Sequence, residues 1–335
     1  MVSSAPALRD RFGRTADYLR LSVTDRCDLR CTYCMAEDMT FLPRNEVLSF
    51  EELYRLCLIF LRHGVRKIRV TGGEPLARRN IMALFGLLAP HLRTGDLDEV
   101  TLTTNGTQLS RHAAALFAAG VRRVNVSLDT RDGARYAAIT RRGRIEKVLA
   151  GIEAALSAGL KIKINAVAMQ GGFETEVDDL IRFAHGQGMD LTLIEEMPLG
   201  DVSHDRRASH LSLTDLRQRL SRRWTMTPLP DRTGGPARYM RVAETGGRLG
   251  FITPLSCDFC AGCTRLRVSA TGELFTCMGE EGSVGLRDVL RSGGSDQVLA
   301  ARILDAVSRK PKGHAFRISS SGVAGIARPM SYLGG

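Results

Sequence analysis

Residues 49–75 read SFEELYRLCLIFLRHGVRKIRVTGGEP, and this stretch carries the pattern that decides the fold. Its first half places apolar residues at helical spacing, with Ser49 at the N-cap position and Glu52 at the capping-box position. Gly64 follows as a typical C-terminal cap. The alternation of polar and apolar residues at 67–71 then predicts a β-strand that ends at two glycines. The stretch therefore predicts a helix followed at once by a strand.

The same unit, a short strand followed by an amphipathic helix, recurs from residue 19 to about residue 200. We expect strands at 19–23, 67–71, 100–104, 123–128, 161–168 and 191–195. Strands that alternate with helices run parallel and are joined by right-handed crossovers. Six units are too few for a closed eightfold barrel. The prediction is an α/β fold built on a partial (β/α)6 TIM-like barrel.

The pattern changes after residue 200. Residues 201–212 are polar and loop-like, and later strands are joined by turns at Gly246-Gly247 and at Thr271-Gly272. We expect residues 1–200 to form the partial barrel and residues 201–335 to form a smaller C-terminal α+β layer that closes its open side. A terminal Gly334-Gly335 is by default disordered chain.

Composition narrows the possible functions. The 335 residues are 44% hydrophobic and 25% charged, with 47 Lys and Arg against 36 Asp and Glu, a net charge of +11. The excess fits either solubility or an anionic ligand such as nucleic acid, phosphate or a nucleotide. No targeting segment and no apolar run of roughly 18 residues is visible, so we expect a cytoplasmic protein. Thiols stay reduced there, so the eight cysteines are expected to be ligands or catalytic groups.

Three cysteines, Cys27, Cys31 and Cys34, follow the first predicted strand with the spacing C-x3-C-x2-C. Thiolates this close in sequence can converge on one metal centre in a loop. Structural zinc normally takes four protein ligands, whereas three thiolates suit a four-iron cluster with one iron left open. The C-terminal ends of barrel strands are where active sites form, and these cysteines are expected at that end.

A second cysteine set lies near the other end of the chain and consists of Cys257, Cys260, Cys263 and Cys277. Four cysteines could form a closed tetrahedral zinc site. The same spacing, a CxxC knuckle followed by a later cysteine, also suits an iron–sulfur cluster, and the residues alone leave both open. Cys57 lies in an apolar helical pattern and is expected in the core.

The first cysteine motif, with Tyr33 before its third cysteine and GGEP after the second strand, resembles the radical S-adenosylmethionine superfamily. The resemblance to one of its families, the GTP 3′,8-cyclases of molybdenum cofactor biosynthesis, runs from about residue 19 to the end of the chain. It is carried by RLSVTDRC at 20–27, IRVTGGEPL at 68–76, LTTNG at 102–106, VNVSLD at 124–129, FC-x2-C-x-R-x-R at 259–267 with Cys277, and YLGG at 332–335.

The resemblance implies a lyase that forms a carbon–carbon bond within GTP, using two 4Fe-4S clusters and S-adenosylmethionine. It implies as cluster ligands Cys27, Cys31 and Cys34, then Cys260, Cys263 and Cys277, with Cys257 left outside. It implies S-adenosylmethionine contacts at Tyr33, Gly72, Gly73, Glu74, Ser127 and Met197. It implies GTP contacts at Arg20, Lys67, Arg69, Thr103, Lys163, Arg265 and Arg267. Gly334 and Gly335 are expected to reach into the active site, and Thr192 stands where many relatives have an arginine that helps hold GTP.

As partners, the resemblance implies GTP as substrate, a downstream cyclic pyranopterin monophosphate synthase and an electron donor. It also implies a homodimer, with no nucleic acid and no membrane. Two alternatives to this interpretation remain. A peptide-modifying radical enzyme with auxiliary clusters usually has a longer C-terminal cysteine set and does not need the R-x-R that follows Cys263. A zinc-stabilised nucleic-acid-binding protein would explain the charge and the cysteines but not GGEP.

Overall fold

The computed structural model describes residues 5–200, 202, 204–230, 235–255, 260–316 and 326–334. Its first six strands alternate with helices, and each begins and ends within one residue of the predicted bounds. They are β1 (Tyr18–Ser22), β2 (Lys67–Thr71), β3 (Glu99–Thr104), β4 (Arg123–Ser127), β5 (Lys161–Ala168) and β6 (Asp190–Glu195). Each of the first five pairs in parallel with the next strand in sequence, so the repeated strand–helix unit is confirmed.

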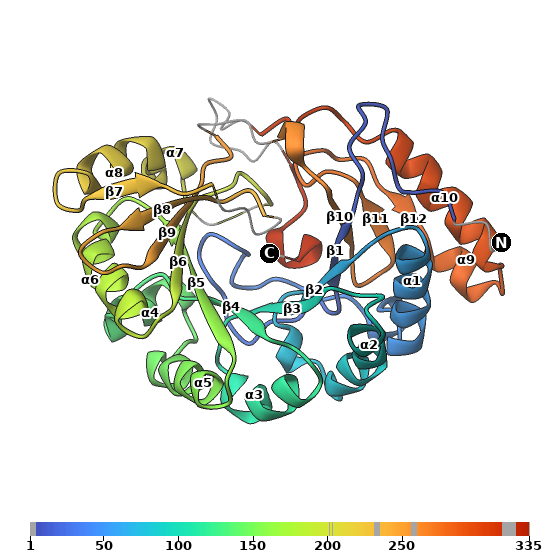
Figure 1. Cartoon of the computed structure of the whole chain (residues 1–335), viewed down its shortest axis with the longest axis horizontal. Helices are drawn as coiled ribbons and strands as arrows, with labels where there is room; N and C mark the ends of the chain where they lie inside the picture. The colour runs from blue at the N-terminus through green and yellow to red at the C-terminus, as the bar shows by residue number, and fades with distance from the viewer. Residues whose placement is uncertain are drawn as a thin grey trace.

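The described residues form one twelve-stranded sheet in the order β12-β11-β10-β1-β2-β3-β4-β5-β6-β9-β8-β7. The strands of the C-terminal region extend both of its edges, with β9 parallel to β6 and β10 parallel to β1. These strands are β7 (Met226–Pro228), β8 (Arg238–Val242), β9 (Arg248–Ile252), β10 (Arg265–Val268), β11 (Glu273–Phe275) and β12 (Val284–Gly285). Figure 1 shows the sheet curved into an arch that stays open on one side. The partial barrel is confirmed, and the division at residue 200 stays a prediction.

Both turns expected in the C-terminal region are confirmed, because β8 with β9 and β10 with β11 form antiparallel pairs. Helices cover the outside of the arch (Figure 1). They are α1 (Phe50–Arg62), α2 (Met82–Thr94), α3 (Leu109–Ala118), α4 (Gly133–Thr140), α5 (Ile145–Ser157), α6 (Phe173–Gly186), α7 (Arg206–Ser209), α8 (Leu213–Leu220), α9 (Arg287–Arg291) and α10 (Asp296–Ser308). The short helix α11 (Met330–Leu333) lies inside the arch instead, and 3-10 turns occur at Arg44–Glu46, Pro75–Ala77 and Cys260–Gly262. Ser49 and Glu52 form the predicted capping box at the start of α1. None of the described helices is long and apolar enough to cross a membrane.

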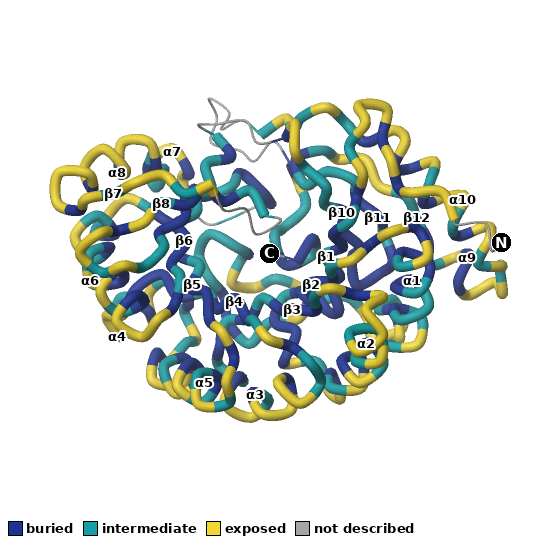
Figure 2. The backbone as a smooth tube through the Cα atoms, in the orientation of Figure 1, coloured by how far each residue is buried: buried dark blue, intermediate teal, exposed yellow. Residues whose placement is uncertain are grey.

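The main hydrophobic core lies between the helices and the outer face of the sheet. Ile68 and Val70 of β2 are fully buried in it, as is Cys57 of α1, which confirms the core prediction for that cysteine. Buried residues lie mainly along the strands, and exposed residues lie on the outer sides of the helices (Figure 2). Because side chains alternate along a strand, the residue between Ile68 and Val70, Arg69, points to the inner face. The inner face of the arch therefore collects the polar side chains.

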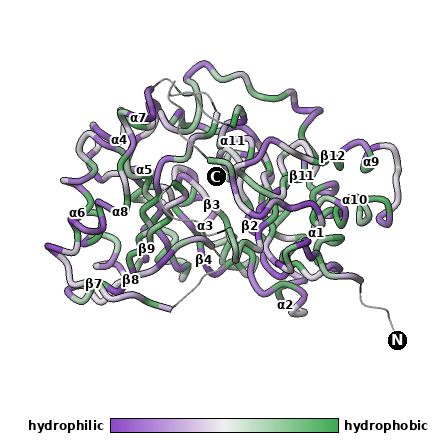
Figure 3. Tube along the Cα trace, turned by 90° about the horizontal axis from the view of Figure 1, so that it is seen from above, coloured by the Kyte–Doolittle hydropathy of each residue, from purple (hydrophilic) through white to green (hydrophobic). Residues whose placement is uncertain are grey.

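The described end of the chain lies inside the arch. Leu333 of α11 is fully buried in a small second core with Leu199, Phe275 and Ile326. Two views at right angles place the C-terminal end in the middle of the molecule (Figures 1 and 3). The default expectation of a disordered tail is therefore wrong for residues 326–334, and Gly335 lies outside the described residues.

Candidate active site

Two adjoining pockets occupy the inner face of the arch and enclose about 1050 and 1070 Å³, part of it continuous with solvent. We name them the first-cysteine pocket, which contains Cys27, and the arginine pocket, which contains Arg20. They share wall residues, which are Asn165, Ile194, Met197 and Met330. A group bound in one pocket can therefore face a group bound in the other.

The first-cysteine pocket is lined by Cys27, Cys31 and Cys34, together with Tyr33. The loop that carries them follows β1, and backbone hydrogen bonds from residues 30 and 32 to residues 140 and 139, at 3.0 and 2.9 Å, tie it to the end of α4. Burial raises the pKa of the Cys34 thiol to about 12. A bound metal centre reverses this preference, because coordination deprotonates thiols. Three thiols on one loop around one pocket fit a three-thiolate cluster.

The glycines of GGEP also line this pocket, and their close contacts explain why glycine stands there. A Cβ on Gly72 would lie 2.5 Å from the Thr24 carbonyl oxygen, and one on Gly73 would lie 2.4 Å from the Arg26 carbonyl oxygen. The Gly73 amide donates to the Thr24 carbonyl at 2.8 Å. The segment that leads into Cys27 therefore packs directly on this backbone.

Glu74 has a different position from the one predicted. It is fully buried and is absent from the described lining of both pockets. Its carboxylate accepts hydrogen bonds from the amides of Leu76 at 2.9 Å and Asn105 at 2.6 Å, and from the Thr104 hydroxyl at 2.8 Å. Burial raises the pKa of Glu74 to about 7, against the effect of these donors. Glu74 thus fixes the loop after β2 to the end of β3.

Ser127 and Met197 line the first-cysteine pocket, as expected for contacts of S-adenosylmethionine. Thr103 was expected beside GTP, but it lines this pocket and not the arginine pocket within the described residues. The Thr103 hydroxyl oxygen is buried and makes no hydrogen bond within the protein. This hydroxyl group is available to a polar ligand bound in the first-cysteine pocket.

Two further residues, which stand directly after predicted strands, hold the cysteine loop. Asp129, just after β4, accepts from the Tyr33 hydroxyl at 2.8 Å and from the Val167 amide at 2.8 Å. Asn105, just after β3, donates to the Asp28 carboxylate at 2.7 Å and lies 3.7 Å from the Cys27 sulfur. Both residues stand at the C-terminal end of a predicted strand, the position at which the sequence indicates functional residues in a barrel of this kind.

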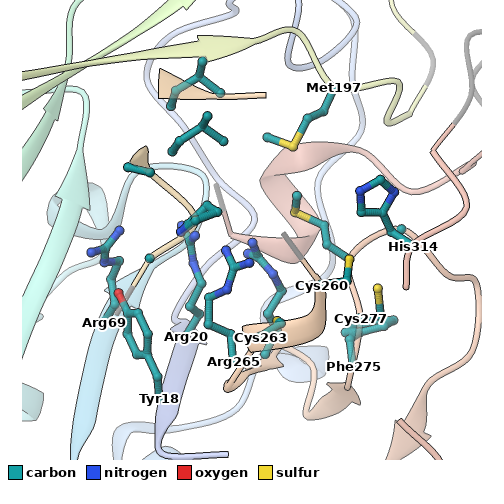
Figure 4. Close-up of a pocket in the computed structure, with 18 of the residues that line it drawn as sticks. Tyr18, Arg20, Arg69, Met197, Cys260, Cys263, Arg265, Phe275, Cys277 and His314 are labelled. Atoms are coloured by element: carbon teal, nitrogen blue, oxygen red, sulfur yellow. The ribbon is translucent and has the colours of Figure 1, made fainter. Parts of the chain in front are cut away.

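The arginine pocket is lined by cations and by the later cysteines, which face one another across it (Figure 4). The cations are Arg20, Arg69, Lys163, Arg265 and Arg267, and the cysteines are Cys260, Cys263 and Cys277. Sheet register explains the row of arginines, because Arg20 of β1 is paired with Arg69 of β2 and with Arg267 of β10. Among the described residues, no Asp or Glu lines the pocket.

Burial and mutual repulsion lower the pKa values of the cations in this pocket. Burial, and then the charges of Arg267 and Arg69, lower the pKa of Arg20 well below its usual value. Burial and the charge of Arg265 lower the pKa of Arg267 to about 9. The pKa of Lys163 is lowered too, mainly by burial and then by Arg69. An anionic ligand would relieve this repulsion, so the pocket is built for a polyanion.

Lys67 was expected to contact GTP, and Thr192 stands where many relatives have an arginine that helps hold GTP. Lys67 begins β2 beside Tyr18, and Thr192 is fully buried within β6. Neither lines the arginine pocket in the part of the chain that the structure describes. The structure therefore brings the other predicted cations together without Lys67.

Gly334 lies between the two pockets. The Arg267 guanidinium donates to the Gly334 carbonyl oxygen at 2.5 Å. Gly334 has φ 73°, and a Cβ there would lie 2.1 Å from the Thr71 hydroxyl oxygen, next to Gly72. The end of the chain thus touches both the arginine row and the glycine loop, where no side chain would fit.

The later cysteines surround one wall of the arginine pocket. A turn at Cys260–Gly262 brings the Cys263 amide within 3.0 Å of the Cys260 carbonyl. Burial opposes ionisation of Cys263, but the charges of Arg265 and Lys310 outweigh it and lower its pKa to about 7. Cys257 and Phe259 lie outside the described residues. Among those described, no three His, Cys, Asp or Glu side chains are gathered closely enough to hold a single metal ion.

Two family models match successive parts of the chain. Residues 21–184 match the family model of the radical SAM superfamily, and residues 189–316 match that of Molybdenum Cofactor Synthesis C. Among solved structures, Streptococcus suis SuiB bound to S-adenosylmethionine aligns with a TM-score of 0.57 and 17% identity over 86% of this chain and 68% of SuiB. Native anSMEcpe with bound AdoMet aligns with a TM-score of 0.59 and 17% identity over 88% of this chain and 81% of anSMEcpe. Fold and motif together define a radical SAM enzyme.

Full-length relatives identify the family. The GTP 3′,8-cyclase of Rhodopseudomonas palustris is 57% identical over 98% of this chain and 96% of its own length. The GTP 3′,8-cyclase of Mesorhizobium japonicum is 54% identical over 97% of this chain and 99% of its own length. The GTP 3′,8-cyclase of Brucella melitensis is 53% identical over 100% of this chain and 98% of its own length. The chain belongs to the GTP 3′,8-cyclase family.

Proposed function

We propose that the protein converts GTP and S-adenosylmethionine to (8S)-3′,8-cyclo-7,8-dihydroguanosine 5′-triphosphate, 5′-deoxyadenosine and methionine, the first step of molybdenum cofactor biosynthesis. One observation carries this proposal. A pocket with the C-x3-C-x2-C cysteines adjoins a pocket with buried cations and the later cysteines, and Met197 belongs to the wall of both. A reactive species made on one side meets a bound polyanion on the other.

On the cofactor side, Cys27, Cys31 and Cys34 would hold a 4Fe-4S cluster. With one electron, this cluster and S-adenosylmethionine would supply a 5′-deoxyadenosyl radical that takes the hydrogen from C3′ of GTP. After C3′ joins C8, a second electron and a proton would be needed to give the dihydro product, which has the mass of GTP. The role of the protein is to bind and orient the cofactor and to exclude water. Gly72 and Gly73 present their backbone to the pocket, and its other proposed cofactor contacts are Tyr33, Thr103, Ser127 and Met197.

On the substrate side, the cations of the arginine pocket would hold the triphosphate. A planar guanidinium can pair two phosphate oxygens, and several cations are needed for a triphosphate. We propose that Cys260, Cys263 and Cys277 hold a second 4Fe-4S cluster, at which the guanine is oriented. Catalysis is then chiefly positioning, with C3′ and C8 of one substrate held close to the radical and to each other.

Several partners follow from the same proposal. An electron donor must reduce the first cluster, and a cyclic pyranopterin monophosphate synthase would consume the product. We propose that the protein works in the cytoplasm as a homodimer, with no nucleic acid or membrane as partner. These statements rest on family resemblance.

Anaerobic incubation of the reconstituted protein with GTP, S-adenosylmethionine and dithionite tests the reaction, with products read by mass spectrometry. We expect 5′-deoxyadenosine and a cyclised triphosphate with the mass of GTP, and deuterium at C3′ of GTP should appear in 5′-deoxyadenosine. ATP in place of GTP is the control. If 5′-deoxyadenosine forms while GTP is neither consumed nor labelled, the substrate is wrong and the peptide-modifying alternative regains weight.

A further inference from the structure

Lys310 is a buried lysine behind the later cysteines. It follows α10, is 3% exposed, and does not line the arginine pocket in the described part of the chain. Its ammonium group donates to the Arg265 carbonyl oxygen at 3.0 Å and to the Thr276 carbonyl oxygen. Arg265 stands two residues after Cys263, and Thr276 stands directly before Cys277. One side chain therefore joins the two strands that present these cysteines.

The third cysteine is tied to the same segment by Arg14. The Arg14 guanidinium donates to the Cys260 carbonyl at 2.8 Å and to the carbonyls of Pro311 and Lys312 at 2.5 and 2.9 Å. Arg14 itself is paired with Asp10 at 2.5 Å. Residues 310–312 thus connect the backbones around all three described cysteines of this set, although they are distant from them in sequence.

In the described part of the chain, the charge of Lys310 has no carboxylate to balance it. Among the described residues, no Asp or Glu oxygen lies within ion-pair distance of its ammonium group, whereas Arg14 has Asp10. The groups that would carry the opposite charge are the sulfur atoms of Cys263 and Cys277, once metal coordination deprotonates them. Burying an unpaired ammonium is unfavourable, and it persists where an anion compensates it.

We propose that Lys310 is a positioning and charge-compensating residue for the metal centre of Cys260, Cys263 and Cys277. It fixes the spacing of the two cysteine-bearing strands through their carbonyl groups. It also places one positive charge behind the thiolates, on the side away from the substrate. The inference rests on the proposed function, in which these cysteines hold an iron–sulfur cluster. Charges and hydrogen bonds near the sulfur atoms set the affinity and the reduction potential of such a cluster.

The test uses the full-length chain in which Cys27, Cys31 and Cys34 are replaced by Ala, so that only the second cluster can bind. Into this background go Lys310→Met, Lys310→Arg and Lys310→Gln. Lys312→Met is the matched control, because Lys312 is exposed whereas Lys310 is buried. After anaerobic reconstitution, two quantities are measured in each: the rate at which a chelator removes iron, and the midpoint potential by EPR.

We expect Lys310→Met to lose iron at least about tenfold faster than the Lys312→Met control, in the range of other changes behind metal ligands. At a fixed potential the ratio of reduced to oxidised cluster should fall about tenfold, a shift of ~59 mV to more negative values. Lys310→Arg should retain the potential, because it retains the charge. Lys310→Gln retains a donor without the charge, so it should show the potential shift even if the methionine variant does not fold.

Different results overturn different statements. If the parent background binds no iron, the second cluster itself is wrong and the role of Lys310 falls with it. If the parent binds iron but Lys310→Met and Lys310→Gln match Lys312→Met in both measurements, only the role of Lys310 is wrong. Equal shifts in Lys310→Arg and Lys310→Met would leave a packing role and overturn charge compensation.

Discussion

Arg20 and Arg267 are register partners on the parallel strands β1 and β10, so two guanidinium groups stand side by side on the inner face of the sheet. Their repulsion lowers the pKa of Arg20, after the larger effect of burial. Replacing Arg20 by Met should weaken GTP binding roughly 10- to 150-fold, because a charge-assisted phosphate bond is worth about 1.5–3 kcal/mol. Anaerobic calorimetry measures this change.

The same substitution should leave the ligand-free protein at least as stable as before, since it removes one of several crowded cations. Arg302→Met, at an exposed position of α10, is the control and should leave GTP binding unchanged. Tripolyphosphate alone should raise the melting temperature of the unaltered protein, and by less in Arg20→Met. Equal GTP affinity in Arg20→Met and the control would remove this arginine from the phosphate site.

The parallel strands could be predicted closely because their signals are local. Apolar runs, capping residues and glycine turns lie within a few residues of each strand, as at Ser49 and Gly64. The six predicted cluster cysteines, the glycines Gly72 and Gly73 and the four predicted arginines also fall in the two pockets. The register that aligns Arg20 with Arg267 could not be predicted, because those residues are distant in sequence.

Other features depend on contacts that no local pattern encodes. The attachment of β9 and β10 to opposite edges of one sheet is a matter of tertiary packing. Glu74 stands in a motif associated with the cofactor, yet its carboxylate is used by three donors of the protein. The role of Lys310 also appears only when α10 is placed behind β10 and β11.

Replacing Cys27, Cys31 and Cys34 together by Ala should remove about half of the bound iron and abolish cleavage of S-adenosylmethionine. The remaining iron should belong to the later cysteine set. Iron and acid-labile sulfide per chain, with 5′-deoxyadenosine by chromatography, measure both effects. Cys57→Ala is the control, since this buried cysteine of α1 lies in the main core. Unchanged iron content, or zinc as the metal found, would contradict the assignment.

Glu74→Gln should destabilise the protein by about 1–3 kcal/mol, because one of the donors now bonded to the carboxylate is left facing an amide NH2 inside the protein. The affinity for S-adenosylmethionine should fall as the loop after β2 shifts. Thermal unfolding and equilibrium dialysis give the two numbers. Glu146→Gln, whose side chain is 70% exposed, is the control. A stable variant with normal cofactor affinity would show that the three hydrogen bonds do not fix this loop.

His185 should make the stability depend on pH at a place remote from both pockets. It is 7% exposed, with Nδ1 2.6 Å from the Thr245 hydroxyl and Nε2 3.1 Å from the Arg248 carbonyl. Burial lowers its pKa below the model-peptide value of 6.5, against the opposing charge of Asp190. Below pH 6.5 the unfolded chain therefore takes up a proton before the folded one does, and this contribution to stability is lost as the pH falls.

Melting temperatures between pH 8 and pH 5.5 test this contribution. The unaltered protein should lose more stability over that range than His185→Gln, which cannot be protonated at this position. His91→Gln is the control, because this histidine belongs to the last turn of α2 and lies beside Asp96 near the surface. Identical pH profiles of the unaltered protein and His185→Gln would contradict the prediction.

Gly334 should be required for cyclisation and dispensable for cofactor cleavage. Its φ of 73° and the 2.1 Å approach to the Thr71 hydroxyl leave no room for a Cβ, and its carbonyl holds the Arg267 guanidinium at 2.5 Å. Gly334→Ala, or deletion of Gly334 and Gly335, should lower the yield of cyclised product at least about a hundredfold, the scale of a lost positioning contact. Iron content should not change, and 5′-deoxyadenosine should still form. Gly293→Ala is the matched control, because Gly293 has φ 76° but nothing within 4 Å of an added Cβ. If Gly334→Ala cyclises GTP as fast as Gly293→Ala does, the end of the chain has no part in positioning the substrate.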